Sequence, residues 1–234
     1  TGLSSSERRI DYVSVCYDPN ANETAVIFQH DGDGDKLKGV VGTVSGTSIS
    51  FGALATLSNS GAKDIDTVFD PDTNKIIVSF MNKSSSNYGT CNVVAISGTD
   101  ISTSHVGSPF GSNKAEKNRV VYDTNSNKVV FFCIDDLQSA QDGHGRAVVG
   151  TNTSSSISFG SVTSFNVTGS NYETAQQRFG AAFDSTANKV VVAFRDSADG
   201  NKGKAKTGTV SGTSITFGTT STFSSTNTTE VNAV

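Results

Sequence analysis

The chain repeats one arrangement of apolar and polar positions four times. Each copy has an aromatic residue, an aspartate, three variable residues and an asparagine, and a run of apolar residues follows. The copies begin at Tyr17, Phe69, Tyr122 and Phe183. Repetition at a period of roughly 50 to 60 residues is typical of a protein built from one supersecondary unit that cannot bury a core alone.

The fourth copy predicts four strands most clearly. Residues 178–183 form the first strand, and Asp184 to Asn188 form a tight turn, since Asp accepts backbone hydrogen bonds and Asn tolerates the left-handed conformation. The apolar run 189–194 is the second strand, and residues 207–210 are the third. A Ser-Gly-Thr turn then leads to the alternating strand 214–218, a sequence echoed at 42–52.

The burial implied by these patterns falls from the second strand to the fourth. The second strand is apolar on both faces, which requires cover on both sides, whereas the fourth alternates and leaves one face wet. A four-stranded antiparallel sheet between two similar sheets would give this order. We therefore predict an all-β protein, a β-propeller of four-stranded antiparallel blades; a β-solenoid and a sandwich of paired units are the alternatives.

The repeat divides the chain into one domain of four units, with a surplus strand at the end. The units span residues 10–57, 62–110, 116–165 and 176–223, and residues 229–234 match the first strand of a further unit. The sequence also starts at Thr1 and not at Met. We expect that the polypeptide continues into more blades, or that the surplus strand pairs with another subunit.

Composition narrows the range of partners. Only 17% of residues are charged, the net charge is -4, and no basic cluster extends beyond Arg8 and Arg9, so a nucleic-acid partner is not expected. No apolar stretch is long enough to cross a bilayer, so membrane insertion is not expected either. The three cysteines, Cys16, Cys91 and Cys133, lie in apolar strands and are interpreted mainly as small buried hydrophobic residues, with a disulfide as the alternative.

The loop between the second and third strands of the first unit is the candidate metal site. It carries Asp31, Asp33 and Asp35 alternating with glycine, an arrangement that can surround a hard cation such as Ca²⁺. The distal glutamate of the usual calcium loop is missing at this spacing. The favoured interpretation is therefore a solvated turn without any cofactor, and a Ca²⁺ site is the alternative.

The equivalent loops of the other units carry the candidate ligand-binding residues. Variable loops on a rigid scaffold are the usual place for recognition, and an exposed tyrosine can stack on a sugar. The candidates are Tyr88, Asn87, His144, Asp142 and Tyr172. They predict a glycan-binding, lectin-like propeller as the alternative to a structural role.

Catalytic motifs are missing from the sequence. No nucleophile elbow, metalloprotease helix or phosphate-binding loop occurs, and an Asp-box sialidase motif cannot be built without tryptophan. A sialidase-like glycoside hydrolase is therefore the least favoured function, and no catalytic residue is expected. The repeated Asp18, Asp70, Asp123 and Asp184 are explained as turn residues.

The repeat resembles segments of known structural proteins. Residues 183–196 and 42–52, the latter echoed at 208–218, are similar to repeats in virion structural and fibre-like proteins of marine bacteriophages. The resemblance implies an exposed part of a virion or extracellular assembly, in contact with other protein subunits and with a role in assembly or adhesion. On this basis the sequence predicts a non-enzymatic module at a virion surface or outside the cell.

Overall fold

The computed structural model describes residues 9–111, 113–136, 143–153, 156–166, 179–229 and 231–232. Within these residues the chain is all-β, with antiparallel sheets and two short 3-10 turns, Asp31–Asp33 and Ser197–Asp199. No helix in this part of the chain has the length and apolar character needed to cross a membrane.

The strands of each unit follow one another in sequence and pair with their neighbours. The first unit has β1 (Ile10–Asp18), β2 (Glu23–His30), β3 (Lys36–Ser45) and β4 (Ser48–Phe51), and β5 (Ala55–Asp70) passes into the second unit, with β6 (Lys75–Asn82), β7 (Tyr88–Ser97) and β8 (Asp100–Gly107). The third has β9 (Ala115–Asp123), β10 (Lys128–Asp136), β11 (Gly143–Asn152), β12 (Ile157–Phe159) and β13 (Thr163–Asn166). The fourth has β14 (Phe179–Asp184), β15 (Lys189–Asp196), β16 (Lys202–Ser211), β17 (Ser214–Phe217) and β18 (Ser221–Ser224).

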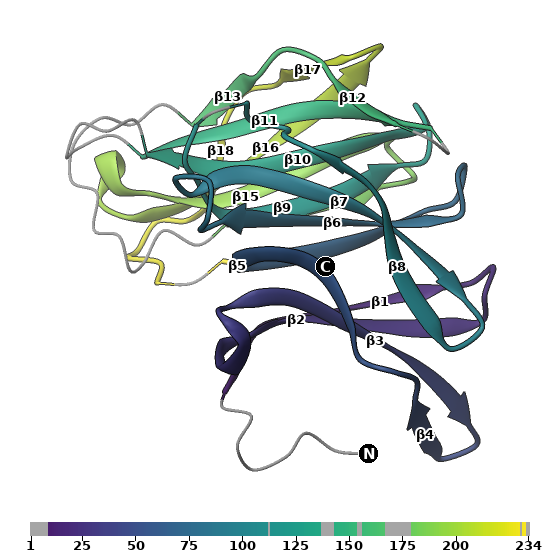
Figure 1. The fold of residues 1–234 in the computed structure, drawn as a ribbon. Coiled ribbons are helices and arrows are strands. Elements are labelled where there is room, and N and C mark those ends of the chain that lie inside the picture. The colour runs from purple at the N-terminus through teal and green to yellow at the C-terminus, as the bar shows by residue number, and fades with distance from the viewer. Residues whose placement is uncertain are drawn as a thin grey trace.

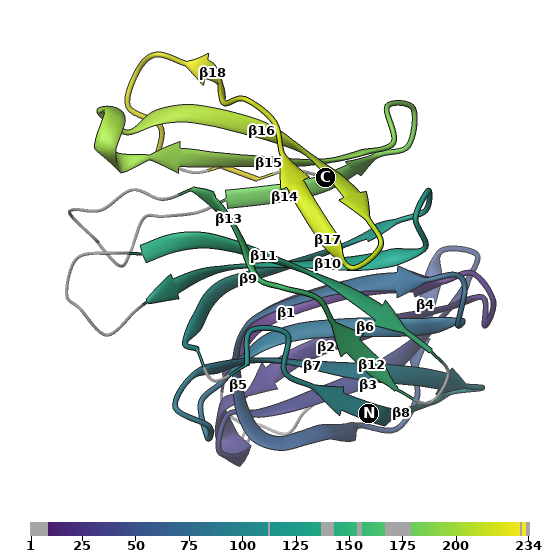
Figure 2. The same cartoon turned by 90° about the horizontal axis from the view of Figure 1, so that it is seen from above.

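The four units lie in chain order, from the purple strands of the first to the yellow strands of the last (Figure 1 and Figure 2). The first two units share one eight-stranded sheet because β5 pairs with β3 through its first half and with β6 through its second half. The third and fourth units are separate five-stranded sheets. None of these sheets closes on itself within the described residues, so the sequence-predicted units are present while a closed propeller is not observed.

The outer strand differs from its prediction. In the third and fourth units it is broken at the Phe-Gly sequence into two short strands, and in the first unit the break separates the short β4 from the long β5, whereas β8 of the second unit is continuous. At each break a glycine amide donates to the third strand, as Gly160 N does to the Val149 carbonyl at 2.9 Å. The chain then bends, and the second piece pairs with the same strand in a shifted register.

The surplus strand predicted at 229–234 is also not observed where the structure describes it. Residues 229, 231 and 232 are not in a strand, and residues 230, 233 and 234 lie outside the described residues. Elsewhere each first strand pairs with the strand after its Asp turn.

The Asp turns that join the first and second strands are built as predicted. In all four, an aspartate Oδ1 accepts hydrogen bonds from the backbone amides two and three residues later, as Asp18 does from Asn20 and Ala21 at 2.9 and 3.0 Å. The asparagine that ends each turn has a positive φ between 53° and 57°. The structural interpretation of these four aspartates is therefore confirmed.

The hydrophobic core lies between successive units. One cluster joins the first and second units, a second joins the second and third, and a third joins the third and fourth. The last of these contains a set of phenylalanines, in which the rings of Phe165 and Phe179 are 5.4 Å apart. Cys16, Cys91 and Cys133 are free and buried within these clusters, as the sequence predicted, and burial raises the pKa of Cys16 and of Cys91 to about 12.

Backbone contacts fix the spacing of the units. A Cβ added to Gly52 would lie 2.1 Å from the carbonyl oxygen of Thr99 in the next unit, and one added to Gly160 would lie 1.7 Å from that of Thr213. No side chain fits at such distances. The glycine after the outer phenylalanine therefore lets one unit contact the Ser-Gly-Thr turn of the next.

Candidate functional site

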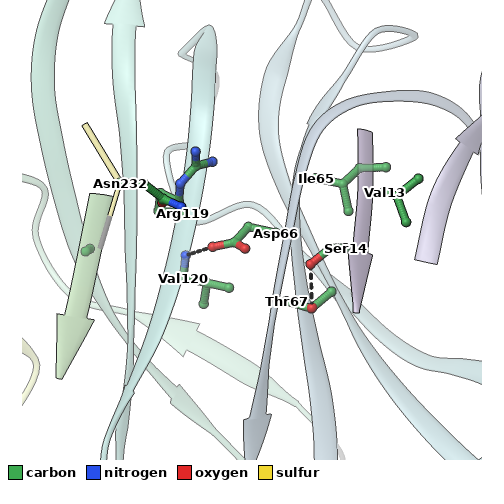
Figure 3. A pocket seen from close by; sticks show the side chains of 9 residues that line it. Val13, Ser14, Ile65, Asp66, Thr67, Arg119, Val120 and Asn232 are labelled. Atoms are coloured by element: carbon green, nitrogen blue, oxygen red, sulfur yellow. Dashed lines mark hydrogen bonds between the residues drawn. The ribbon is translucent and has the colours of Figure 1, made fainter. Parts of the chain in front are cut away.

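The first strands of the units lie side by side and enclose a cavity. The C-terminal half of β5 packs between β1 and β9, and β9 also contacts β14. The cavity between these strands, which we call the axial pocket, has a volume of about 400 Å³. Figure 3 shows side chains that line it. Its lining comes from all four units and from the C-terminal segment, and consists of Val13, Ser14, Ile65, Asp66, Thr67, Arg119, Val120, Ala181 and Asn232.

Asp66 is the titratable carboxyl group of the axial pocket. Its Oδ2 accepts a hydrogen bond from the Val120 amide at 2.9 Å, which ties the second unit to the third (Figure 3). Burial raises the pKa of Asp66 above its ordinary value of 3.8, against the opposing effects of this amide and of Arg119. A carboxyl group whose pKa is raised inside a cavity is a candidate acid catalyst.

The other polar groups of the axial pocket are held by neighbouring strands. Ser14 Oγ and Thr67 Oγ1 share a hydrogen bond of 2.7 Å between the first and second units. The Arg119 guanidinium donates to the carbonyl of Asn118 at 2.7 Å and lies 6.0 Å from the centre of the Phe179 ring. These contacts leave a positive charge near Asp66 on a side chain whose position is restrained.

A second cavity of about 440 Å³ lies along the same strands, nearer the loops that join second and third strands. We call it the mouth pocket. Asp11, Tyr12 and Glu116 from β1 and β9 line it together with several cationic side chains; the full lining is Arg9, Asp11, Tyr12, Gln29, Asp31, Asp35, Lys63, Met81, Lys83, Asn87, Lys114 and Glu116. Arg9 Nε contacts Asp11 at 2.8 Å and Lys114 Nζ contacts Glu116 at 3.2 Å, so both carboxylates have cationic partners.

Tyr12 lies among the acidic groups of the mouth pocket. Burial is the main reason that its pKa is raised above 10.0, and the negative charges of Asp64, Asp11 and Glu116 add to the effect. The tyrosine hydroxyl therefore keeps its proton and can donate it in a hydrogen bond to a carboxylate or to a bound ligand.

The inner strands carry a β-bulge at the same repeat position in three units. The pairing register shifts between Asp11 and Ser14, between Lys63 and Asp66, and at the equivalent point of β9. At these bulges the non-glycine residues Tyr12, Asp64 and Lys117 have positive φ values of 51°, 53° and 56°. The repeated bulge turns neighbouring side chains toward the pockets, and such strained backbone is often found at functional sites.

The bulges are also tied to one another. Asp64 Oδ2 accepts a hydrogen bond from the Lys117 amide at 2.9 Å, and the Lys117 ammonium group lies 3.9 Å from Asp64 Oδ1. Two successive acidic side chains of β5, Asp64 and Asp66, thus hold the backbone of β9. This arrangement makes the geometry of the two pockets depend on contacts between units.

Three of the predicted site residues meet at the mouth pocket. Asp31, Asp35 and Asn87 come from loops of two different units, and all three line this cavity. Tyr88 begins β7 beside Asn87 and is partly buried, and its backbone pairs with Lys114. The sequence grouped these residues with loops and missed the acidic residues of the inner strands.

The remaining predicted ligand-binding residues do not join this group. The His144 ring lies next to Arg146, with 3.1 Å between Nδ1 and Nη2, and Arg146 in turn approaches Asp135 at 3.4 Å. These residues belong to the third unit and line neither pocket. Asp142 and Tyr172 lie outside the described residues.

In the predicted calcium loop, lysine side chains contact the aspartates. Asp33 accepts from Lys36 at 2.9 Å and lies 2.7 Å from the Lys38 ammonium group, while Asp35 binds Gln29 and Lys83. Hydrogen bonding, first to Lys38 and then to Lys36, lowers the pKa of Asp33 to about 2. Within the described chain no group of three or more His, Cys, Asp or Glu side chains could hold a metal, and calcium stays a prediction.

Comparison with known proteins finds similarity in structure alone. No family model and no curated protein matches the sequence. A Bifidobacterium bifidum protein proposed to be an exo-β-1,3-galactanase has a TM-score of 0.56 and 10% identity, over 94% of this chain and 75% of that chain. This likeness shows a shared fold.

Two further solved structures are more distant. An exo-β-1,3-galactanase from Phanerochaete chrysosporium, solved with β-1,3-galactotriose, has a TM-score of 0.48 and 8% identity, over 82% of this chain and 43% of that chain. A periplasmic gluconolactonase from Pseudomonas aeruginosa has a TM-score of 0.41 and 10% identity, over 90% and 72%. These two carry no argument below. The resemblance to phage virion proteins was not tested by any of the matches and stays a prediction.

These comparisons overturn the prediction of a non-enzymatic structural or adhesion module, and with it the lectin-like alternative. The solved protein that shares the fold carries an enzyme name. The prediction relied on missing local motifs, but the acidic residues at the pockets come from strands in three different units. Asp11, Asp66 and Glu116 are separated by about 50 residues each, so no motif of contiguous sequence would contain them.

Proposed function

We propose that this chain is a glycoside hydrolase, with the axial and mouth pockets as its active site. The observation that carries the proposal is Asp66, a carboxyl group with a raised pKa in a cavity lined by all four units. The fold shared with a protein proposed to be an exo-β-1,3-galactanase supports the choice of reaction class. Fold alone does not fix function, so the site has to be tested directly.

We also propose that the units are blades of a β-propeller. Successive units pack face to face, their first strands surround the axial pocket, and their outer strands lie farthest from it. Binding sites on such a scaffold form where the inner strands and their loops converge. This agrees with the location of the two pockets.

The chemistry needs one protonated and one ionised carboxyl group. Asp66 donates its proton to the glycosidic oxygen as the bond to the anomeric carbon breaks, and a water molecule adds to that carbon. The proton lost by the water passes to the second carboxylate. Asp11 and Glu116 are the candidates for this base, because both are carboxyl groups of the mouth pocket and each lies beside a cationic side chain.

Hydrolysis of β-1,3-linked galactose oligosaccharides is the first activity to measure, alongside other β-linked oligosaccharides. We expect Asp66→Asn to lower kcat by about 10²- to 10⁴-fold, the usual contribution of general acid catalysis. Glu116→Gln and Asp11→Asn distinguish the two candidate bases. Asp100→Asn changes an exposed carboxylate in the β7–β8 turn and serves as the matched control.

The result also has to separate catalysis from binding and folding. Circular dichroism and urea unfolding check that each variant folds. Hydrolysis that survives in Asp66→Asn would move the chemistry away from the axial pocket. Oligosaccharide binding without any turnover, or no interaction with any member of the panel, would refute the proposed reaction.

A further inference from the structure

The first unit exposes a face that is at least partly covered in the other units. Along β1, Cys16 points into the core shared with the second unit, while the alternating Val13, Val15 and Tyr17 point the opposite way and are more than half exposed. Val44 of β3 and Ile49 and Phe51 of β4 are exposed as well. We call these six residues the rear face of the first unit.

The equivalent residues of the other units show what kind of surface the rear face is. Ile49 is 48% exposed, whereas its equivalents Ile101, Ile157 and Ile215 are 4%, 8% and 3% exposed. Val13 is 54% exposed, whereas its equivalent Phe179 in the fourth unit is 1% exposed. In the later units these positions are buried by the unit that precedes them. The rear face of the first unit therefore has the composition of an interface between units.

The fourth unit exposes an apolar face that complements the rear face of the first unit. In the first and third units, Leu57 and Phe165 are 4% and 1% exposed because the next unit covers them, but the equivalent Phe223 is 57% exposed. The small apolar residues Ala182, Val191, Ala193 and Ala205 are also only partly buried. We call this the front face of the fourth unit.

The space around equivalent glycines supports the same pairing of the front and rear faces. Gly218 is the equivalent of Gly52 and Gly160, but a Cβ added to it would meet only Thr207, with 3.1 Å to the hydroxyl oxygen. The backbone that crowds the other two glycines belongs to the Ser-Gly-Thr turn of the next unit. The first unit carries such a turn at Ser45, Gly46 and Thr47, and in this structure nothing contacts it in that way.

We propose that the front face of the fourth unit binds the rear face of the first unit in a second copy of this chain. The contact repeats, between molecules, the packing that already joins successive units within one molecule. It is head-to-tail, so after the first contact each copy keeps one unused face, and the pair keeps one front face and one rear face. The assembly then either closes into a ring or continues as a filament.

Sedimentation equilibrium on the 234-residue chain tests the proposal. We expect the average mass to rise with concentration above the 24.3 kDa of the monomer. Val15→Asp on the rear face and Gly218→Ala on the front face should each abolish this rise, because one introduces a charge and the other a backbone clash with Thr47. Both sites are exposed in the single molecule, so urea unfolding should change little. Val106→Asp, at an exposed valine of β8, is the control and should still associate.

Mixing the two variants distinguishes the head-to-tail contact from a symmetric one. Val15→Asp keeps its front face and Gly218→Ala keeps its rear face, so the mixture should form a 1:1 dimer and nothing larger.

Self-association of Gly218→Ala alone would mean that rear faces pair with each other, which overturns the proposal. A chain that stays monomeric up to about 1 mM also overturns it. The proposal is also overturned if a longer natural polypeptide is monomeric and hydrogen exchange shows that a further unit covers its β1. Ile49→Asp replaces Val15→Asp if the latter does not fold.

Discussion

The Asp66 carboxylate in the second unit accepts a hydrogen bond of 2.9 Å from the backbone amide of Val120 in the third unit. The contact crosses from β5 to β9, and it places a partly buried acid where the first strands meet. One side chain therefore joins two units and supplies the titratable group of the axial pocket. Its ionisation should affect both stability and activity.

Asp66→Asn should stabilise the fold at neutral pH. Because the folded-state pKa of Asp66 is raised above 3.8, its contribution to stability is complete below that value and is lost as the pH rises through the folded pKa. Asparagine stays neutral and can still accept from the Val120 amide through Oδ1. Urea unfolding from pH 3 to pH 8 should show a flatter profile for the variant. An unchanged profile would mean that burial does not govern this carboxyl group.

Gly160→Ala should destabilise the protein, and Gly218→Ala should not. The alanine methyl group at position 160 would lie 1.7 Å from the Thr213 carbonyl oxygen, so the third and fourth units would have to separate. Overpacking of this kind costs about 1–3 kcal/mol. At position 218 the nearest atom is a threonine hydroxyl that can rotate. Urea unfolding at low protein concentration measures both, and equal effects would argue against the inter-unit packing described above.

Asp70→Ala should cost more stability than Asp184→Ala, although both remove the same turn hydrogen bonds. Asp70 is buried, and its Oδ2 also accepts from Thr73 Oγ1 and from Asn152 Nδ2 of the third unit, each at 2.8 Å. Asp184 is exposed, so water can replace it. We expect losses of about 2–3 kcal/mol for Asp70→Ala and about 1 kcal/mol or less for Asp184→Ala. Comparable losses in denaturant titrations would contradict this ranking.

Asp33 and Asp199 should titrate near pH 2 in low salt. Lys38 and Lys36 lower the pKa of Asp33, and Lys202 and Lys204 lower that of Asp199, in each case to about 2. Lowered values mean that the stabilisation is present above the ordinary value of 3.8 and is lost as the pH falls through about 2. Carboxyl chemical shifts followed by NMR should show both values rising toward 3.8 in 1 M salt, since these pairs are exposed. A salt-independent value would exclude the lysine contacts as the cause.

The sequence predicted those parts of the protein that depend on nearby residues. The turns at Asp18 and its three equivalents form because a carboxylate can reach amides two and three residues away. The strands after them form because their apolar residues need cover on both faces. The free, buried cysteines follow from the same local patterns.

The mouth pocket shows where local patterns were insufficient. Asp31, Asp35 and Asn87 were predicted as parts of separate binding sites, and the structure brings them to one cavity beside Asp11 and Glu116. The one available signal was the repeat itself, because Tyr12, Asp64 and Lys117 occupy equivalent positions before the apolar core of each first strand. Positive φ values at these positions could not be read from residue types that usually avoid them.

By itself, the sequence determined the repeated unit, its strand order and its turns, because hydrogen bonds and side-chain alternation within about ten residues control those features. Only the tertiary structure decided which side chains face the axial and mouth pockets and which apolar faces remain open. Those outcomes depend on how units about 50 residues apart pack on one another, and on β-bulges that redirect an inner strand by one residue. The acidic site and the two unmatched faces are therefore properties of the assembled units.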